Sequence, residues 1–412
     1  MDNKLIGACI IGQSGGPTAV INSSAYGVIC TALDSPDITA VYGAANGIVG
    51  VLNEVLYDMS QEDPYELSLL PYTPSSELGS CRYKLADPKK DDTDYRRLLE
   101  VFCKYNVRYF FYNGGNDSMD TCNKISRFMS SVGYDCRVIG IPKTIDNDLC
   151  GTDHCPGFGS AAKYIATSVA EVYKDTMVYD TGSITVIEIM GRHAGWLTGA
   201  SGLASLAGAG PDLIYLPELD FDMDDFMEKV INIYKQKRKC LIAVSEGIHY
   251  SDGSFVSEAK ISTTDGFGHA QLGGLAATLA SLIKNRTGAK VRGIELSLLQ
   301  RCGSHLASQT DIDEAFLAGK AAVEAAVSGD TGRMVAFERG NGSGYTCTTK
   351  LVPLETAANA EKKVPREWIT PDGTGITQDF IDYVLPLIQG APKRITENGL
   401  PRFAKLKKVT VK

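Results

Sequence analysis

The sequence predicts an α/β fold with two doubly wound parallel-sheet domains and the active site in the cleft between them. The segments 4–11, 107–113 and 183–190 are short runs that are mostly apolar or β-branched, and helical spacing recurs between such runs along the chain. Strands that are apolar throughout are typical of parallel sheets covered by helices on both faces. The 412 residues are also enough for two or three domains.

The remaining elements follow from the same two patterns. We expect strands at 4–11, 39–43, 107–113, 137–141, 183–190, 212–216 and 240–245, and helices ending near Leu33, over 93–104 and from about 116 onward. The uncharged stretch 193–211 holds only three leucines among Gly, Ala and Ser, which favours a buried helix over a membrane span. Beyond Gly340 prolines break the pattern, and we interpret the basic last 20 or so residues as a solvated tail without a function.

Charge and cysteine content narrow the classes of partner. Lys plus Arg is 41 and Asp plus Glu is 49, a net charge of −8. The chain therefore lacks the overall positive field that would attract nucleic acid or an anionic membrane. An anionic ligand must then be held by a few basic side chains and backbone N–H groups. The 11 cysteines contain no Cys-x-x-Cys pair, and Met1 leads into a strand without a signal peptide. We therefore expect reduced thiols and a cytoplasmic protein.

Glycine-rich or polar loops follow the strands that end near Ile11, Asn113, Ile141, Met190 and Ser245. In open α/β sheets, ligands bind outside the carboxyl ends of the strands. The loop 12–17 has neither the spacing of a dinucleotide fingerprint nor the Gly-Lys-Ser/Thr ending of a P-loop. Its Ser14, Gly15 and Gly16 leave backbone amides open to a phosphate, although a plain tight turn explains the loop equally well.

The loop 142–148, Pro-Lys-Thr-Ile-Asp-Asn-Asp, carries the strongest chemical signal. It places Lys143, Asp146 and Asp148 directly after a buried strand. Two carboxylates beside a lysine supply a base, an orienting group and a cation for phosphoryl charge. Phosphoryl transfer needs this set, because its catalysis consists mostly of positioning and charge stabilisation.

Two further loops are compatible with the same chemistry. Asn116, Asp117 and Ser118 are good N-caps, but the preceding Gly114–Gly115 pair also clears space for a ligand. In the loop 190–195, Arg192 offers a planar fork suited to phosphate. We interpret the adjacent His193 as a hydrogen-bonded structural residue.

These motifs, in this order and at these intervals, resemble the phosphofructokinase family over about residues 4–340. The resemblance rests on the motifs Gly-Gly-x-Asp-Ser, Pro-Lys-Thr-Ile-Asp-Asn-Asp, Met-Gly-Arg and Gln-Arg. Members that use ATP typically have glycine at the positions of Asp117 and Lys143. The Asp117–Lys143 pair resembles the residues found at these positions in the branch of the family that uses inorganic pyrophosphate.

The resemblance implies a role for each matching residue. Asp146 would be the general base toward the 1-hydroxyl of fructose 6-phosphate, and Asp117 and Lys143 would act in catalysis and donor choice. The remaining implied contacts are Thr144, Ile145, Asp148, Met190, Gly191, Arg192, Glu246, Arg292 and Arg301 for the sugar phosphate, Gly15 and Arg82 for pyrophosphate, and Asn116 for Mg²⁺. Arg292 could be lent by a neighbouring subunit, and a homodimer or homotetramer is implied.

Three positions depart from the family pattern. The usual aspartate at the magnesium position is Asn116, an arginine expected to reach the sugar phosphate is Ser183, and a histidine or tyrosine before Gln-Arg is Leu298. The first departure leaves the metal to rely more on pyrophosphate and water. The other two remove donors to the sugar phosphate.

The resulting expectation is a pyrophosphate-using sugar-phosphate kinase of glycolysis that works in both directions. Its domains would be 1–157 plus about 300–345 for the phosphoryl donor, 158–299 for the sugar phosphate, and a C-terminal extension at 346–412. Two alternatives remain: an ATP-dependent enzyme of the same fold, and a non-catalytic regulatory subunit that only binds sugar phosphates.

Overall fold

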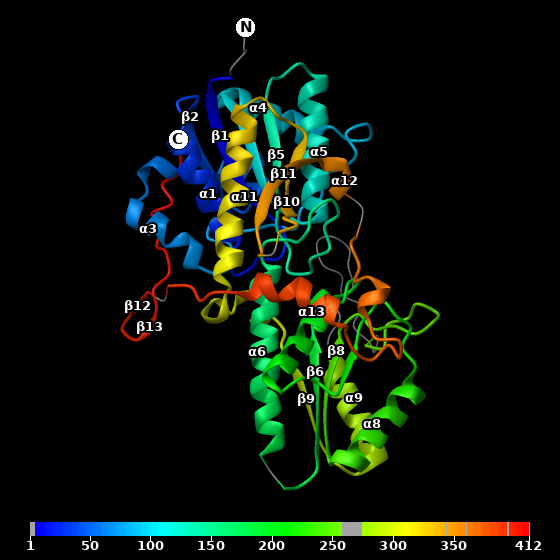
Figure 1. The fold of residues 1–412 in the computed structure, drawn as a ribbon. Helices are drawn as coiled ribbons and strands as arrows, with labels where there is room; N and C mark the ends of the chain where they lie inside the picture. The colour runs from blue at the N-terminus through cyan, green and yellow to red at the C-terminus, as the bar shows by residue number, and fades with distance from the viewer. Residues whose placement is uncertain are drawn as a thin grey trace.

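Two β-sheets, each flanked by helices, lie one beyond the other along the molecule in the computed structural model (Figure 1). The structure describes residues 5–178, 180–257, 274–342, 344–358, 361–393 and 395–411. The prediction of an α/β fold with parallel sheets in two domains is confirmed.

The first sheet has seven strands among the described residues. In spatial order they are β11 (Cys347–Pro353), β10 (Arg333–Arg339), β5 (Arg137–Pro142), β4 (Val107–Gly114), β1 (Gly7–Gln13), β2 (Ile38–Ala44) and β3 (Leu56–Asp58). The five central strands are parallel, and β3 and β11 pair antiparallel at the two edges. The chain leaves β1 toward β2 on one side and reaches β4 on the other. The loops after β1 and β4 therefore meet at a switch point, where such sheets bind ligands.

The alternation of side chains along these strands supplies two separate cores. Cys9, Ile11 and Phe111 face one way, against α1 (Ile21–Leu33) and α11 (Gln309–Val327). Ile10 and Phe110 face the other way. The helices on that second face are α2 (Ile48–Leu52), α4 (Thr93–Lys104), α5 (Asn116–Ser131) and α12 (Leu354–Ala357), and α3 (Pro64–Ser68) lies after β3 in the chain.

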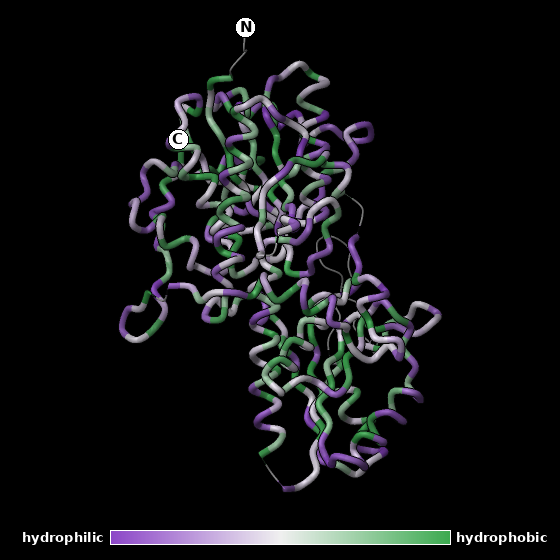
Figure 2. Tube along the Cα trace, viewed as in Figure 1, coloured by the Kyte–Doolittle hydropathy of each residue, from purple (hydrophilic) through white to green (hydrophobic). Residues whose placement is uncertain are grey.

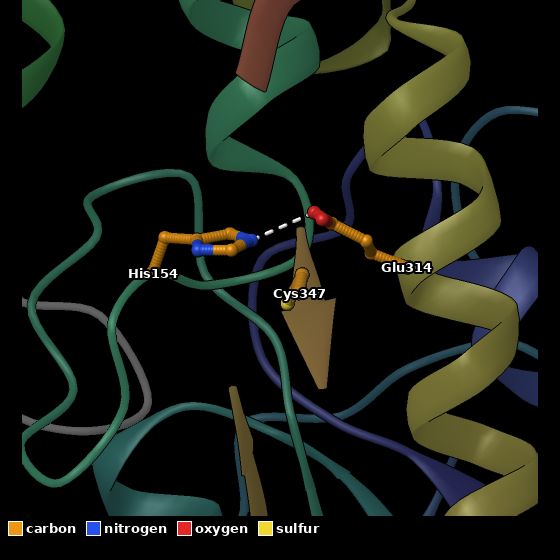
Figure 3. Close-up of side chains that lie close together, drawn as sticks. All are labelled: His154, Glu314 and Cys347. Atoms are coloured by element: carbon orange, nitrogen blue, oxygen red, sulfur yellow. Dashed lines mark hydrogen bonds and ion pairs between the residues drawn. The ribbon is translucent and has the colours of Figure 1, made fainter. Parts of the chain in front are cut away.

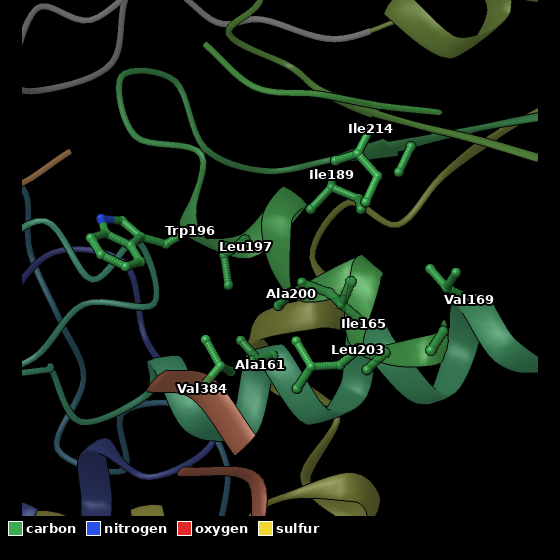
Figure 4. Close-up of a cluster of buried hydrophobic side chains, with 14 of the residues drawn as sticks. Ala161, Ile165, Val169, Ile189, Trp196, Leu197, Ala200, Leu203, Ile214 and Val384 are labelled. Atoms are coloured by element: carbon green, nitrogen blue, oxygen red, sulfur yellow. The ribbon is translucent and has the colours of Figure 1, made fainter. Parts of the chain in front are cut away.

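The second sheet is parallel and has the order β7 (Leu213–Tyr215), β8 (Lys239–Ser245), β6 (Ser183–Ile189) and β9 (Lys290–Glu295). One face packs on α6 (Phe158–Met177) and α7 (Trp196–Ala200), and the other on α8 (Met223–Lys237) and α9 (Leu275–Thr287). Hydrophobic segments gather along the strands of both sheets in Figure 2. Figure 4 shows the core around α6, which Val384 from the C-terminal helix α13 (Gln378–Val384) also enters. The short α10 (Leu299–Cys302) follows β9.

The observed elements agree with most of the expected ones to within three residues. The stretch 193–211 differs: it forms the short α7 followed by a 3₁₀ helix (Ser201–Ala207), and residues 205–208 are exposed. Glycine at 199, 202 and 208 weakens a regular helix there, which explains the break.

The C-terminal part is more integrated than the sequence suggested. The extension expected from residue 346 begins with β11, which is an edge strand of the first sheet. The basic last segment is hydrogen-bonded rather than free, because Lys407 and Lys408 donate their backbone N–H groups to Glu62 and the Val409 carbonyl accepts from Asp58. A small hairpin of β12 (Thr396–Glu397) and β13 (Leu400–Pro401) precedes it.

All 11 cysteines are free thiols, as expected. Among the described residues, no helix combines the length and apolar character that crossing a bilayer requires.

Candidate active site

A cleft of about 650 Å³ lies at the carboxyl ends of both sheets. The loops that follow β1, β4, β5, β6 and β8 all reach it. Its lining consists of Gly15, Gly16, Arg82, Gly115, Asn116, Asp117, Ser118, Lys143, Thr144, Asp146, Asp148, Met190, Arg192, His193, Glu246 and Glu361.

The loop 143–148 leaves β5 in a tight turn that presents two carboxylates to the cleft. The Thr144 hydroxyl accepts the backbone N–H of Asp146 at 3.1 Å, a local bond that holds the turn. Burial and the nearby charge of Glu246 raise the pKa of Asp146 to about 6. Burial and the charge of Asp146 raise the pKa of Asp148 as well. The pair is thus poised to exchange a proton near neutral pH.

Lys143 is buried, with 3% of its surface exposed, and its ammonium donates to the Gly16 carbonyl at 2.6 Å. Burial lowers the pKa of Lys143 to about 8, although Asp146 partly offsets this effect. Gly15 adopts φ +75°, and a Cβ there would lie 3.3 Å from Lys143 Nζ. A glycine therefore keeps the loop after β1 close to this cation.

Two more cations stand on the same side of the cleft. Arg82 lines the cleft, and Arg301 Nη1 lies 3.1 Å from where a Cβ on Gly16 would be. Burial and the charge of Arg82 lower the pKa of Arg301, which agrees with cations gathered in one place. Such a group is suited to an anion that carries several charges.

Asn116 and Asp117 form the first turn of α5 at the floor of the cleft. Asn116 Nδ2 donates to Asp148 Oδ2 at 3.4 Å, which makes the Asn116 amide and the Asp148 carboxylate neighbours in the cleft. Asp117 lies 3.7 Å from the exposed Lys84 ammonium. A carboxylate at this helix N-terminus occupies a place that favours an anion.

The second domain contributes the loops after β6 and β8. The backbone N–H of Gly191 donates to Glu246 Oε1 at 3.2 Å, and Ser245 Oγ donates to the Gly191 carbonyl. Gly191 adopts φ +135°, which a side chain would disfavour. These bonds fix the loop that presents Met190 and Arg192 to the cleft.

One further cluster of possible metal ligands among the described residues consists of His154, Glu314 and Cys347 (Figure 3). Both ring nitrogens of His154 are engaged, with Asp153 at 2.8 Å and Glu314 at 2.7 Å. Burial and the charge of Glu314 raise the pKa of Cys347 to about 12, so its thiol stays protonated. We therefore interpret the cluster as a buried imidazolium held by two carboxylates.

Comparison with known proteins decides the family. The phosphofructokinase family model matches residues 8–326. The chain belongs to the phosphofructokinase family. A relative from Halomonas elongata, named pyrophosphate–fructose 6-phosphate 1-phosphotransferase, is 48% identical over 400 residues, which cover 96% of this chain and 95% of the relative. One with the same name from Xanthomonas campestris is 45% identical and covers 98% and 97%. The crystal structure of a pyrophosphate-dependent phosphofructokinase from Marinobacter aquaeolei has a TM-score of 0.89 at 42% identity, and covers 99% and 98%.

Most residues that the family resemblance implied meet in the cleft. Those that line it are Gly15, Arg82, Asn116, Asp117, Lys143, Thr144, Asp146, Asp148, Met190, Arg192 and Glu246. Ile145 instead packs in the core of the second domain, because the turn directs its side chain away from the cleft, and it can offer only its backbone. Arg301 stands beside Gly16 and near Arg82.

Arg292 lies outside the lining of the cleft. It is half-exposed on β9 and pairs with Asp175 at 3.0 Å. The position of Ser183, where the family expects an arginine, is on the neighbouring strand β6, and Leu298 is exposed just before α10. Neither supplies a donor to the cleft.

The lining also includes residues to which the family resemblance assigned no role. Gly16, Gly115 and Ser118 belong to the loops 12–17 and 114–118, which the sequence had already indicated as open to a ligand. His193, interpreted above as structural, is an exposed residue of the lining. Glu361 comes from the C-terminal segment, which carries no recognisable motif.

Proposed function

We propose that this chain transfers a phosphoryl group between inorganic pyrophosphate and the 1-hydroxyl of D-fructose 6-phosphate, reversibly, in glycolysis and gluconeogenesis. The observation that carries the choice of donor is the pair Asp117 and Lys143. The Asp117 carboxylate stands at the α5 N-terminus, and the Lys143 ammonium is bound to the Gly16 carbonyl across the cleft. The carboxylate repels a longer polyphosphate, and the ammonium offsets charge on a short one.

Asp146 is the general base of the proposed reaction. As the 1-oxygen of the sugar forms its bond to phosphorus, the bond from phosphorus to the leaving phosphate breaks and Asp146 takes the hydroxyl proton. Its pKa, raised to about 6, leaves the carboxylate ionised at pH 7 and still basic enough to accept that proton. Thr144 and Asp148 stand beside it to orient the sugar.

The part of the cleft that would bind pyrophosphate is formed by Lys143, Arg82 and Arg301. Their charges lie around the Gly15–Gly16 turn, which leaves backbone groups accessible to phosphate oxygens. The developing charge on the transferring phosphoryl group and on the leaving phosphate would be offset by groups already in place.

The sugar phosphate would bind to the loops of the second domain. Arg192 supplies a guanidinium fork, and Glu246 both accepts from the Gly191 backbone and faces the cleft. Arg292 points away from its own cleft, so we propose that it reaches the sugar phosphate of a second copy in a homodimer or homotetramer. We propose a cytoplasmic enzyme with no nucleic acid or membrane partner, in keeping with its net charge of −8.

Mg²⁺ is the proposed metal. The Asn116 amide and the Asp148 carboxylate offer oxygen atoms, which are the ligands this cation prefers, and pyrophosphate and water would complete the shell. When bound, the ion would neutralise charge on the donor. Asn116 carries no charge, so pyrophosphate should contribute much of the metal affinity.

A steady-state assay of the purified chain with pyrophosphate and ATP as rival donors tests this proposal. We expect turnover with pyrophosphate in both directions and little with ATP. Turnover with ATP as fast as with pyrophosphate would favour the ATP-dependent alternative. No turnover with either donor, together with sugar-phosphate binding, would favour the regulatory subunit.

The variant Asp146→Ser tests the assignment of the base. Removal of a general base costs roughly 10²–10⁴-fold in kcat, and KM should change little because the cleft and its arginines remain. An unchanged kcat with a higher KM would make Asp146 a binding residue instead.

A further inference from the structure

The C-terminal segment that crosses the junction of the two domains touches the catalytic loop directly. We call residues 361–364 together with α13 the C-terminal clamp. In Figure 1, α13 lies across the junction beside the end of α6. Phe380 and Val384 anchor it in the core of the second domain, and Figure 4 shows Val384 there.

Asn147, between the two cleft carboxylates, depends on the clamp. It is fully buried and adopts φ +54°, a left-handed conformation that asparagine tolerates better than most other non-glycine residues. Its Nδ2 donates to the Tyr383 hydroxyl at 2.9 Å, and its Oδ1 accepts from the Cys155 backbone at 3.0 Å. The Tyr383 hydroxyl in turn donates to the Asp153 carbonyl at 2.6 Å.

The other half of the clamp binds the backbone of the same loop. The Lys362 N–H donates to the Asp148 carbonyl at 2.7 Å, and Glu361 forms an antiparallel bridge with Leu149. The Lys362 ammonium donates to the Asp153 carbonyl at 2.6 Å. A main-chain bond thus holds the start of the turn 148–153 to the clamp, and side-chain donors from the clamp hold its end.

The clamp also contacts the loop that presents Arg192. The indole N–H of Trp196, just after that loop, donates to the Lys362 carbonyl at 2.8 Å. The Trp196 ring lies 5.3 Å from the Tyr383 ring. The C-terminal clamp therefore contacts both the catalytic loop of the first domain and the sugar-phosphate loop of the second, and it fixes their relative positions.

We propose that Tyr383 is a positioning residue for phosphoryl transfer, which acts through Asn147 to hold Asp146 and Asp148 in place. This inference rests on the proposed function for its readout. If the hydroxyl only stabilised the fold, its removal would lower the melting temperature and leave kcat unchanged. A hydroxyl that sets the carboxylate geometry matters for kcat, since a misplacement of about 1 Å costs on the order of 10²-fold.

The variant Tyr383→Phe removes the hydroxyl and keeps the ring. We expect kcat with pyrophosphate to fall about 10- to 100-fold, with KM for fructose 6-phosphate changed less than about 3-fold.

Tyr134→Phe is the matched control. The Tyr134 hydroxyl also donates to main-chain oxygens, those of Phe102 and Val107, each at 2.9 Å. Val107 is the first residue of β4, at the end of that strand away from the cleft. We expect a similar fall in melting temperature for both variants and a fall in kcat for Tyr383→Phe alone. Equal kcat in Tyr383→Phe and wild type overturns the proposal, as does a rise in KM at constant kcat.

Asn147→Gly gives a second route if Tyr383→Phe does not fold. Glycine keeps the left-handed backbone accessible and deletes the side chain that reaches Tyr383. It should lower kcat to a similar extent, and the double variant should be no slower than the slower single one. Fully multiplied effects, or a normal kcat for Asn147→Gly, would overturn the inference. Wild-type enzyme without pyrophosphate activity would instead contradict the proposed function.

Discussion

Asp117 is a single carboxylate whose removal should change donor choice. It stands in the first turn of α5, where a negative phosphate would otherwise be stabilised. We expect Asp117→Gly to admit ATP measurably, and Lys143→Gly to cost roughly 10²–10³-fold in pyrophosphate-dependent turnover, the scale of one preorganised charge. The double variant should prefer ATP, though slowly.

Competition assays with both nucleotide and pyrophosphate measure this change. Asp120→Gly is the control for the loss of helix propensity, since Asp120 pairs with Lys124 one turn along the same helix. A folded Asp117→Gly enzyme that binds no ATP would contradict the electrostatic account of donor choice.

Alanine substitutions of Arg192 and Arg301 should weaken the binding of the two substrates to different extents. Each arginine makes charge-assisted bonds worth about 1.5–3 kcal/mol, so an alanine substitution should weaken binding roughly 10- to 150-fold. Arg192→Ala should weaken fructose 6-phosphate more than pyrophosphate. Arg301→Ala, expected from the motif to do the same, should affect pyrophosphate as well, because its guanidinium lies beside Gly16. Separate titrations of each substrate check this, and equal losses for both substrates in Arg192→Ala would mean a structural role.

The pH dependence of kcat/KM should follow the carboxylate pair and Lys143. Activity rises with pH as the pair, whose pKa values are raised by burial, becomes ionised, and it falls as pH passes the Lys143 pKa of about 8 and the cation is lost. Lys143→Arg should be slower but should lack the alkaline limb, because a guanidinium stays charged. An alkaline limb that persists in Lys143→Arg would assign it to another group.

At the scale of elements, the His154 cluster links three segments of the first domain and should make stability depend on pH. Burial lowers the pKa of His154, but hydrogen bonds to Asp153 and Glu314 outweigh this effect and raise it. A raised histidine pKa stabilises the fold at pH values below the unfolded pKa of about 6.5, and the benefit is lost as pH rises through the folded value.

Urea unfolding of wild type and His154→Gln between pH 6 and 9 tests that linkage. Loss of one partner of a buried ion pair costs about 3–5 kcal/mol, so the variant should be less stable by about that amount at pH 6. The difference should shrink toward pH 9. A constant difference across this range would mean that His154 is neutral in the folded state.

The elements that sequence could predict are those with a strong local pattern. Strands such as Val107–Gly114 are mostly apolar, and Thr93–Lys104 has clear helical spacing. The edge strand β11 escaped prediction because Cys347–Pro353 mixes threonine, lysine and proline with its apolar residues and pairs on one side only. The short β3 has three residues and no periodicity to detect.

At the scale of the whole molecule, the motif residues of the site were predictable, and their partners from distant segments were not. The chemical roles of Asp146 and Lys143 could be predicted from their neighbours in the sequence. Glu361 and Tyr383 reach the same loop only because the chain returns more than 200 residues later, a contact that no local pattern encodes. Arg301 likewise lies beside Gly16, 285 residues earlier in the chain, only through tertiary packing.

The order of strands in the first sheet has a consequence for synthesis on the ribosome. β5 pairs with β10 at its outer edge, and β10 begins only at Arg333, about 190 residues after β5 ends. At translation rates of about 5–20 residues per second, that edge stays unpaired for roughly 10–40 s. The second sheet, complete at Glu295, can close in the meantime. The domain whose synthesis starts first is thus finished last, and its open β5 edge is where the nascent chain is most exposed to pairing with the wrong strand.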